Sequence, residues 1–231
     1  MALGRRLPLA LLFVLLVVAL AACGGNGGGA KQAAAAPAQQ TTTDAAGCRS
    51  VTPPAAKART ASKPTKRLNQ TKTYDVLIKT NCGDFTIRLA VKTSPATTAS
   101  FASLVRKGFF NGTVFHRIIP GFVLQGGDPT GTGLGGPGYT TVDKPPASTR
   151  YTKGVVAMAK TGSEAAGTSG SQFFVVTEPD AGLPPDYAVL GTIVKGQATV
   201  DRIGQLGDPA SGSQGAPTET VELENATLTV R

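Results

Sequence analysis

Three side chains near the middle of the 231-residue sequence could together act on a bound molecule: the guanidinium of Arg117, the ring of Phe122 and the amide of Gln125. A guanidinium offers hydrogen-bond donors in a rigid fork and keeps its proton in proteins, so it can stabilise a lone pair but is not a nucleophile. These residue types therefore indicate a site that works by hydrogen-bond donation beside an apolar ring.

The surrounding pattern indicates how these side chains are brought together. Phe115, Arg117 and Ile119 alternate with His116 and Ile118, which is the two-residue period of a β-strand. Pro120-Gly121 then interrupts the strand and changes the direction of the residues that follow. We expect Arg117 and Gln125 to converge beside Phe122.

Two other kinds of chemistry are rejected on their motifs. The only histidine, His116, suggests a hydrolase, but residues 167–171 miss the Gly-x-Ser-x-Gly nucleophile elbow at its last position. Residues 131–136 satisfy Gly-x-Gly-x-x-Gly, but Pro137-Gly138 follows where a dinucleotide site needs the start of a helix. We expect His116 to border the site and to help position it.

The N-terminus has the pattern of an export signal. Arg5-Arg6 precedes an apolar run, residues 7–22, that is short for a membrane span. The run ends in Leu20-Ala21-Ala22-Cys23, which looks like a bacterial lipobox. We therefore predict a signal peptide over residues 1–22 and lipidation of Cys23, which would hold the protein on the extracytoplasmic side of a bacterial membrane. The alternative is a cleaved, soluble secretory protein with an incidental cysteine.

The net charge of +9 is concentrated before the folded part of the chain. Residues 23–72 are rich in Gly, Ala, Thr, Pro and Lys with few large aliphatic side chains, which predicts a disordered basic tether. From Thr73 onward, thirteen basic residues are balanced by thirteen acidic ones. The charge therefore favours attraction to anionic lipid headgroups, and we expect no nucleic-acid binding.

Two cysteines, Cys48 and Cys82, remain once Cys23 carries a lipid. An exported protein lies in a compartment where disulfides persist, so we predict that these two pair and tie the tether to the domain edge. The alternative is a pair of free thiols.

Residues 73–231 are long enough for one folded domain. Their pattern predicts a hairpin of residues 74–79 and 84–89, and helices from Ser94-Pro95 to Lys107-Gly108 and over about 197–205. Further strands are expected at 113–119, 122–125, 155–159, 172–177, 187–194 and 221–230. Many short strands and few helices favour an antiparallel barrel or sandwich, and the pattern alone leaves both open.

The stretch from Phe115 to Asp128 resembles the signature of the cyclophilins, the peptidyl-prolyl cis/trans isomerases, nearly residue for residue. Further motifs similar to the family's follow at residues 154–159, 167–175 and 187–191. The resemblance covers residues 73–231. Together with the lipobox, it indicates a bacterial lipoprotein form of the family. It implies a mainly β fold, a closed eight-stranded antiparallel barrel with a helix over each open end.

The resemblance also implies roles for single residues. Arg117 matches the family's catalytic arginine, and Gln125 and Gln172 match polar contacts to the substrate backbone. The full set of substrate-binding positions that it implies is His116, Phe122, Val123, Gln125, Ala159, Lys160, Thr161, Gln172, Phe174, Leu183 and Tyr187. Gly182 stands where many members have a tryptophan, a difference that affects the expected binding of cyclosporin-like ligands. Lys160 stands where an asparagine is common, a difference that affects the expected substrate preference.

These residue types suit isomerisation of an X-Pro bond. The planar amide resists rotation by about 18–20 kcal/mol because the nitrogen lone pair is delocalised into the carbonyl. In the twisted transition state that nitrogen is pyramidal and basic, and a donor such as Arg117 would stabilise it more than either planar form. No nucleophile, metal or cofactor is required.

We therefore expect a monomeric isomerase that acts on proline-containing, exported polypeptides and assists their folding at the outer face of the membrane. Two alternatives stay open: a non-catalytic holdase that binds proline peptides on the same barrel, and a structural envelope lipoprotein without a ligand. The intact pair of Arg117 and Gln125 favours catalysis, since a pure binder has no need of a donor aimed at the prolyl nitrogen.

Overall fold

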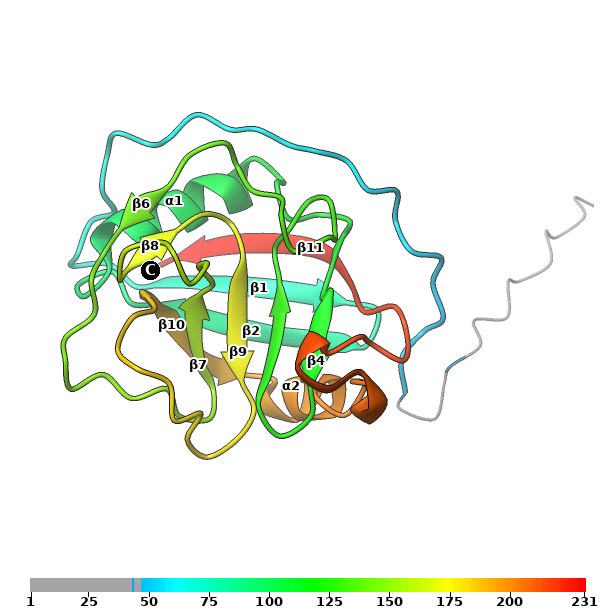
Figure 1. The fold of residues 1–231 in the computed structure, drawn as a ribbon. Helices are drawn as coiled ribbons and strands as arrows, with labels where there is room; N and C mark the ends of the chain where they lie inside the picture. Colours follow the sequence, from blue (N-terminus) through cyan, green and yellow to red (C-terminus); the bar gives the residue numbers. More distant parts are fainter. Residues whose placement is uncertain (1–42, 44–46) are drawn as a thin grey trace, which may run out of the picture. The chain divides into compact units, whose positions relative to one another are not determined.

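The computed structural model describes residue 43 and residues 47–231, which contain one strongly curled antiparallel sheet and two α-helices (Figure 1). In chain order the elements are β1 (Tyr74–Thr80), β2 (Gly83–Leu89), α1 (Pro95–Arg106), β3 (Thr113–Val114), β4 (Arg117–Ile119), β5 (Val123–Gly126), β6 (Thr141–Val142), β7 (Val155–Met158), β8 (Thr168–Ser169), β9 (Phe173–Val176), β10 (Val189–Lys195), α2 (Gln197–Ile203), the 3₁₀ helix η1 (Pro209–Gln214) and β11 (Glu222–Val230). The expected mainly β fold is confirmed.

The sheet is a curled half-barrel and not the expected closed barrel of eight strands. Its nine strands are hydrogen-bonded in the order β3-β11-β1-β2-β10-β7-β9-β5-β4, while β6 and β8 form a separate pair. Across the gap between its edges, the described residues make a single bridge, from Val114 to Asp128. The ladder does not close because β3 is only two residues long and the chain leaves strand geometry at Phe115 and His116. The strand expected at 113–119 is therefore two short strands.

The predicted hairpin of β1 and β2 forms part of the long side of the sheet. Val76 lies opposite Ile87, and Ile78 lies opposite Phe85, with all four side chains buried. Gly83 ends the connecting turn with a φ of 108°, in the left-handed region that favours glycine. The two-residue period of the sequence therefore predicted correctly which side chains face the core.

Helices α1 and α2 lie at opposite ends of the curled sheet, as expected (Figure 1). Pro95 lies in the first turn of α1, where a backbone N–H would have no helical partner. Ser94 makes no side-chain cap, and the carboxylate of Asp143 instead accepts a hydrogen bond from Thr97 N at 2.6 Å. A distant loop thus supplies an acceptor for a free backbone N–H in the first turn of α1, and the local sequence did not reveal this contact.

An aromatic cluster fills the space between α1 and the sheet. The ring of Phe173 packs edge-on against Phe101, Phe110 and Phe115, with centroid distances of 5.6, 6.1 and 5.9 Å. Successive residues of a strand point to opposite faces, so Phe174 points away from this core. It belongs to a second, smaller apolar cluster on the other face of the sheet.

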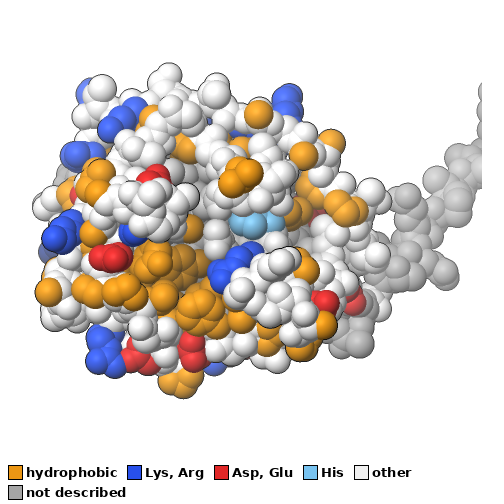
Figure 2. Space-filling model, in the orientation of Figure 1, with side chains coloured by type: hydrophobic (Ala, Val, Ile, Leu, Met, Phe, Trp, Pro, Cys, Tyr) orange, Lys and Arg blue, Asp and Glu red, His pale blue; other side chains and the backbone are white. Residues whose placement is uncertain are grey.

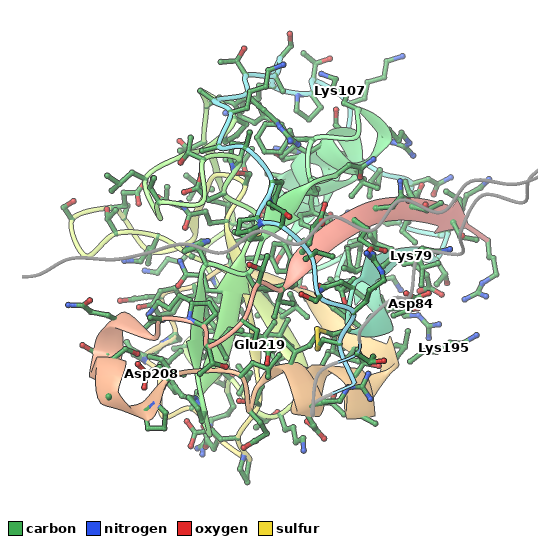
Figure 3. The ribbon with its side chains drawn as sticks, turned by 90° about the vertical axis from the view of Figure 1, so that its right-hand side faces the viewer. Lys79, Asp84, Lys107, Lys195, Asp208 and Glu219 are labelled. Carbon is green, nitrogen blue, oxygen red and sulfur yellow. A yellow bond between two sulfur atoms is a disulfide. The ribbon has the colours of Figure 1, made fainter. Side chains whose placement is uncertain are left out.

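Residues 47–72, called the strap below, run as extended chain along the outside of the domain (Figure 3). Arg49 N donates to Asn81 O at 2.8 Å, and the Asn81 side-chain amide donates to Arg49 O at 2.8 Å. The side chains of Ala61 and Leu68 pack against the main core. This part of the chain therefore differs from the expected loose tether, because its backbone finds partners on the domain.

Cys48 and Cys82 form the predicted disulfide, and both are buried. The bond joins the start of the strap to the turn between β1 and β2. Cys23 and the apolar run of residues 7–22 lie outside the described residues, so the lipid anchor stays a prediction. No helix in the part of the chain that the structure describes is long and apolar enough to cross a membrane.

Candidate functional site

A cavity of about 190 Å³ opens on the face of the sheet that carries Phe174. It is lined by residues of β4, β5 and β9 and of the neighbouring loops: Arg117, Phe122, Val123, Gln125, Ala159, Lys160, Phe174, Leu183 and Tyr187. Every one of these is a residue that the sequence singled out. Figure 2 shows apolar side chains gathered on this face, close to the only histidine.

Strand register brings the central polar residues together. Arg117 on β4 lies opposite Gln125 on β5, and Gln125 lies opposite Phe174 on β9. Residues paired across adjacent antiparallel strands share a face of the sheet, so the three form one row. Phe122 stands just before β5, after the turn at Pro120-Gly121, as the sequence predicted.

Two hydrogen bonds fix the direction of the Arg117 guanidinium. Its Nε donates to Ser213 O at 3.1 Å, and its Nη1 donates to the side-chain oxygen of Gln125 at 3.3 Å. Among the described residues, Nη2 has no hydrogen-bond acceptor. Burial lowers the pKa of Arg117, and Tyr187 partly opposes that shift. Arginine nevertheless keeps its proton in proteins, so Arg117 presents a permanent donor to the cavity.

The apolar wall of the cavity is held from behind by a residue that sequence reasoning missed. The rings of Phe174 and Tyr187 pack edge-on at 5.4 Å. The Tyr151 hydroxyl donates to Tyr187 O at 2.6 Å and accepts from Tyr187 N at 2.9 Å. Burial raises the pKa of Tyr151 to about 12, so the hydroxyl keeps its proton at neutral pH. No local pattern marks Tyr151, because its role depends on contact with a distant loop.

A larger cavity of about 630 Å³ adjoins the first and shares Gln125, Ala159 and Lys160 with it. Its other walls are residues 133–140 and 170–172, Thr161 and Glu164. Two of the predicted substrate-binding residues, Thr161 and Gln172, line this second cavity and not the first.

Lys160 lies at the boundary between the two cavities. Its Nζ lies 5.5 Å from the centroid of the Tyr187 ring, in cation–π geometry. The same ammonium donates to Thr161 O at 3.2 Å and to Glu164 O at 3.1 Å. Lys160, at the position where the resemblance led us to expect an asparagine, is therefore fixed in the cavity wall by these contacts.

The glycine-rich stretch after β5, residues 129–137, folds around one buried carboxylate and is called the glycine loop below. Asp128 accepts hydrogen bonds from Thr130 N at 2.7 Å, Gly133 N at 2.6 Å and Gly135 N at 3.1 Å. Burial acts to raise the pKa of Asp128, but the bonds from Thr130, Gly135 and Gly133 outweigh it and lower the pKa. A side chain at position 135 would collide with this carboxylate. The motif rejected as a dinucleotide site thus builds one wall of the larger cavity.

The glycine loop is joined to the catalytic candidate through two amides. The Gln172 amide nitrogen donates to Gly133 O at 2.8 Å and to Gly135 O at 3.0 Å. The Gln172 oxygen accepts from the Gln125 amide at 3.0 Å. The path then reaches Arg117 through its bond to Gln125.

His116 is the one predicted binding residue that lines neither cavity. Its ring lies beside Gly133, behind the glycine loop, and both ring nitrogens are buried without a hydrogen bond of normal geometry to the described residues. Burial lowers the pKa of His116, and the charge of Arg117 acts in the same direction, while Asp128 opposes them. The imidazole is therefore neutral at pH 7, and a direct contact with substrate stays a prediction.

Comparison of the sequence with known proteins agrees with this geometry. Residues 75–228 match the family model described as cyclophilin type peptidyl-prolyl cis-trans isomerase. The chain is 38% identical over 156 residues to human peptidyl-prolyl cis-trans isomerase-like 1, covering 66% of this chain and 90% of that protein. It is also 38% identical over 198 residues to the probable peptidyl-prolyl cis-trans isomerase B of Mycobacterium leprae, covering 76% of this chain and 65% of that protein.

Solved structures agree as well. A cyclophilin type peptidyl-prolyl cis-trans isomerase from Cryptosporidium parvum superposes with a TM-score of 0.61 at 30% identity, over 68% of this chain and 98% of that one. The crystal structure of the same protein in the presence of the dipeptide Ala-Pro superposes with a TM-score of 0.60, also at 30% identity, over 67% of this chain and 98% of that one.

Proposed function

The chain belongs to the cyclophilin-type peptidyl-prolyl cis/trans isomerases and is an isomerase of that kind, and we propose that Arg117 is its catalytic group. We further propose that its substrates are exported polypeptides. The observation that carries the first part is the row of Arg117, Gln125 and Phe174, which places an arginine donor beside an apolar cavity. Neither a nucleophile nor an acid–base pair is needed for this reaction.

The cavity fits the ring of a proline. Its volume of about 190 Å³ and its walls of Phe122, Phe174 and Leu183 suit a small apolar ring. Burying that ring would exclude water from the reacting amide, which strengthens hydrogen bonds to it. The residue before proline would then lie toward the larger cavity, where Gln125 and Gln172 offer polar contacts.

Arg117 would act on the transition state more than on the substrate. As the X-Pro bond twists, the prolyl nitrogen regains its lone pair and becomes a hydrogen-bond acceptor, which it is not in the planar amide. A donor from Nη2 would meet that lone pair only in the twisted form, and only such differential binding lowers the barrier. Because Ser213 and Gln125 hold the other side of the guanidinium, the donor is pre-oriented.

The test is isomerisation of an Ala-Pro peptide by wild type, Arg117→Ala and Arg117→Lys. If the arginine supplies one transition-state hydrogen bond, its loss should cost about 3–4 kcal/mol, or on the order of 10²–10³ in kcat/KM. Lysine should restore little, because a flexible point charge lacks the rigid fork. Circular dichroism and urea unfolding check that each variant is folded.

The same assay separates catalysis by this residue from simple binding. Phe122→Ala should weaken peptide binding and slow turnover together, because it removes part of the cavity wall. A folded Arg117→Ala protein with wild-type turnover would mean that another group catalyses. Loss of turnover with unchanged peptide affinity would instead support the assigned role and disfavour the holdase alternative for this cavity.

The proposed location and substrates have separate support. The charged and apolar pattern of residues 5–22 and the lipobox ending at Cys23 are those of an exported lipoprotein. A disulfide between Cys48 and Cys82 fits an oxidising compartment outside the cytoplasm. Polypeptides that fold at the outer face of the membrane would then be the available substrates.

A further inference from the structure

We propose that the strap is a positioning element for the active site, acting through the hydrogen bond from Ala61 to Pro137. The proposal rests on the assignment of Arg117 as the catalytic group. It concerns a segment that lies before the part of the chain matched by the family model, which begins at residue 75.

The strap contacts the glycine loop from outside at both of its ends. Lys57 N donates to Pro129 O at 3.1 Å, and Ala61 N donates to Pro137 O at 2.9 Å. These two bonds bracket residues 129–137, part of which lines the larger cavity. Next to the second bond, the side chain of Thr60 lies close to Gly138, since a Cβ built there would meet Thr60 Cγ2 at 3.6 Å.

The strap is itself held firmly where it makes these bonds. The Arg59 guanidinium, between the two contacts, donates to Phe109 O and, at 2.8 Å, to Asn111 O, both just after α1. The buried disulfide of Cys48 holds the start of the strap on the domain. A fixed strap can therefore restrain the loop that it contacts.

The glycine loop needs restraint because of its composition. Gly131 and Gly133 have φ values of 69° and 83°, and Gly138, just after the loop, has 84°. Glycine has the largest backbone freedom of any residue, so a segment rich in it loses the most entropy when it is ordered. Asp128 holds the loop from within, and the strap bonds add contacts from the opposite side.

From the loop, a continuous series of hydrogen bonds leads to the catalytic group. The inner carbonyls of Gly133 and Gly135 accept from Gln172, Gln172 accepts from Gln125, and Gln125 accepts from Arg117. The carbonyls that bind the strap and those that bind Gln172 belong to the same short segment. Displacement of the loop would therefore move the acceptors that orient Gln172 and, through it, Arg117.

The first experiment compares Ala61→Pro with the matched control Ala56→Pro in the full chain. Proline at 61 removes the N–H that binds Pro137 O, whereas the N–H of Ala56, an exposed strap residue, has no acceptor among the described residues. We expect Ala61→Pro to lower kcat/KM for an Ala-Pro peptide by about two- to tenfold, the effect of one lost hydrogen bond. The control should keep the wild-type value.

A second readout follows the side chains directly. The side-chain amide resonances of Gln172 and Gln125 should shift in Ala61→Pro and stay unchanged in Ala56→Pro, which a general loss of stability would not produce. Wild-type resonances together with wild-type kcat/KM in a folded Ala61→Pro protein would overturn the proposal. If wild type itself failed to isomerise the peptide, the proposed function would fail, while the Gln172 resonances would still test the positioning.

A second pair of variants covers the case in which Ala61→Pro does not fold. Arg59→Ala removes the donors to Phe109 O and Asn111 O that hold the strap, and Arg59→Lys keeps a cation that can donate to them. We expect the alanine variant to shift the Gln172 resonances and to lower kcat/KM, and the lysine variant to restore both at least in part. Absence of any change in a folded Arg59→Ala protein would count against the strap.

Discussion

The side-chain oxygen of Gln125 accepts a hydrogen bond from Nη1 of Arg117 at 3.3 Å, across the adjacent strands β5 and β4. Together with the bond from Nε to Ser213 O, it leaves Nη2 without an acceptor among the described residues of the chain. Because Gln125 also donates to Gln172 at 3.0 Å, its own orientation is fixed from the other side. Gln125 thus orients the guanidinium, besides the substrate contact that the family resemblance implied.

We predict that Gln125→Leu lowers kcat/KM for an Ala-Pro peptide by about tenfold, because hydrogen bonds to charged groups contribute about 1.5–3 kcal/mol and part of that orients Arg117. The peptide isomerisation assay measures it. Gln205→Leu, at an exposed position just after α2, is the matched control and should keep wild-type activity. A fully active Gln125→Leu enzyme would show that Ser213 alone orients the guanidinium.

Tyr151→Phe should weaken both the fold and the wall of the smaller cavity. The change removes the hydroxyl that donates to Tyr187 O and accepts from Tyr187 N, leaving both backbone groups without that partner. Leaving such groups unsatisfied costs about 1–3 kcal/mol, which urea unfolding measures. Because Tyr187 is part of the cavity wall, KM should rise more than kcat falls. Unchanged KM in a destabilised variant would mean that the wall does not depend on this hydroxyl.

Much of the site could be predicted because its residues lie close together in the sequence. Arg117, Phe122 and Gln125 are brought together by two short strands and one turn, and such local geometry is visible in the strand period and in Pro120-Gly121. Phe174 comes from farther along the chain, and only the family resemblance connected it to the others. The hairpin and both helices were likewise predicted from the spacing of their apolar residues.

Features that depend on backbone contacts between distant segments were not predictable. Nothing in the sequence near Val114 reveals that the ladder stops at one bridge to Asp128, leaving the barrel open. The composition of residues 47–72 predicts disorder, because it lacks large apolar side chains. The strap is instead held by backbone hydrogen bonds and by Arg59, whose acceptors are carbonyls of the folded domain. Every residue has a backbone carbonyl, so the sequence does not reveal which carbonyls accept these hydrogen bonds.

The proposed lipid anchor rests on Cys23, and the replacement of Cys23 by serine tests it. Cys23→Ser removes the thiol that would carry the acyl chains, so the protein should leave the membrane fraction or accumulate as an unprocessed precursor. Membrane fractionation and the intact mass of the mature protein measure this. Unchanged membrane retention together with unchanged mature mass would rule out the anchor at this position.

The half-buried imidazole of His116, whose two ring nitrogens are covered, should make the stability of the domain depend on pH. Burial lowers the pKa of His116 below its ordinary value of 6.5, so the folded protein binds this proton less readily than the unfolded chain. Well above pH 6.5 the imidazole is neutral in both states, and the full stability is present. As the pH falls below 6.5, the unfolded chain gains a proton first, and the free energy of unfolding decreases until the folded pKa is reached. We predict a lower urea midpoint at pH 5 than at pH 7.5.

His116→Gln provides the comparison, because glutamine cannot titrate and His116 is the only histidine of the chain. The difference between the two midpoints should shrink in this variant. Asp128 also has a lowered pKa, but its contribution is lost only below its ordinary value of 3.8, outside the tested window. Asp75, whose pKa is lowered mainly by its hydrogen bond from Arg88, is outside it for the same reason. If His116→Gln kept the full pH dependence, the attribution of that dependence to the half-buried imidazole would be wrong.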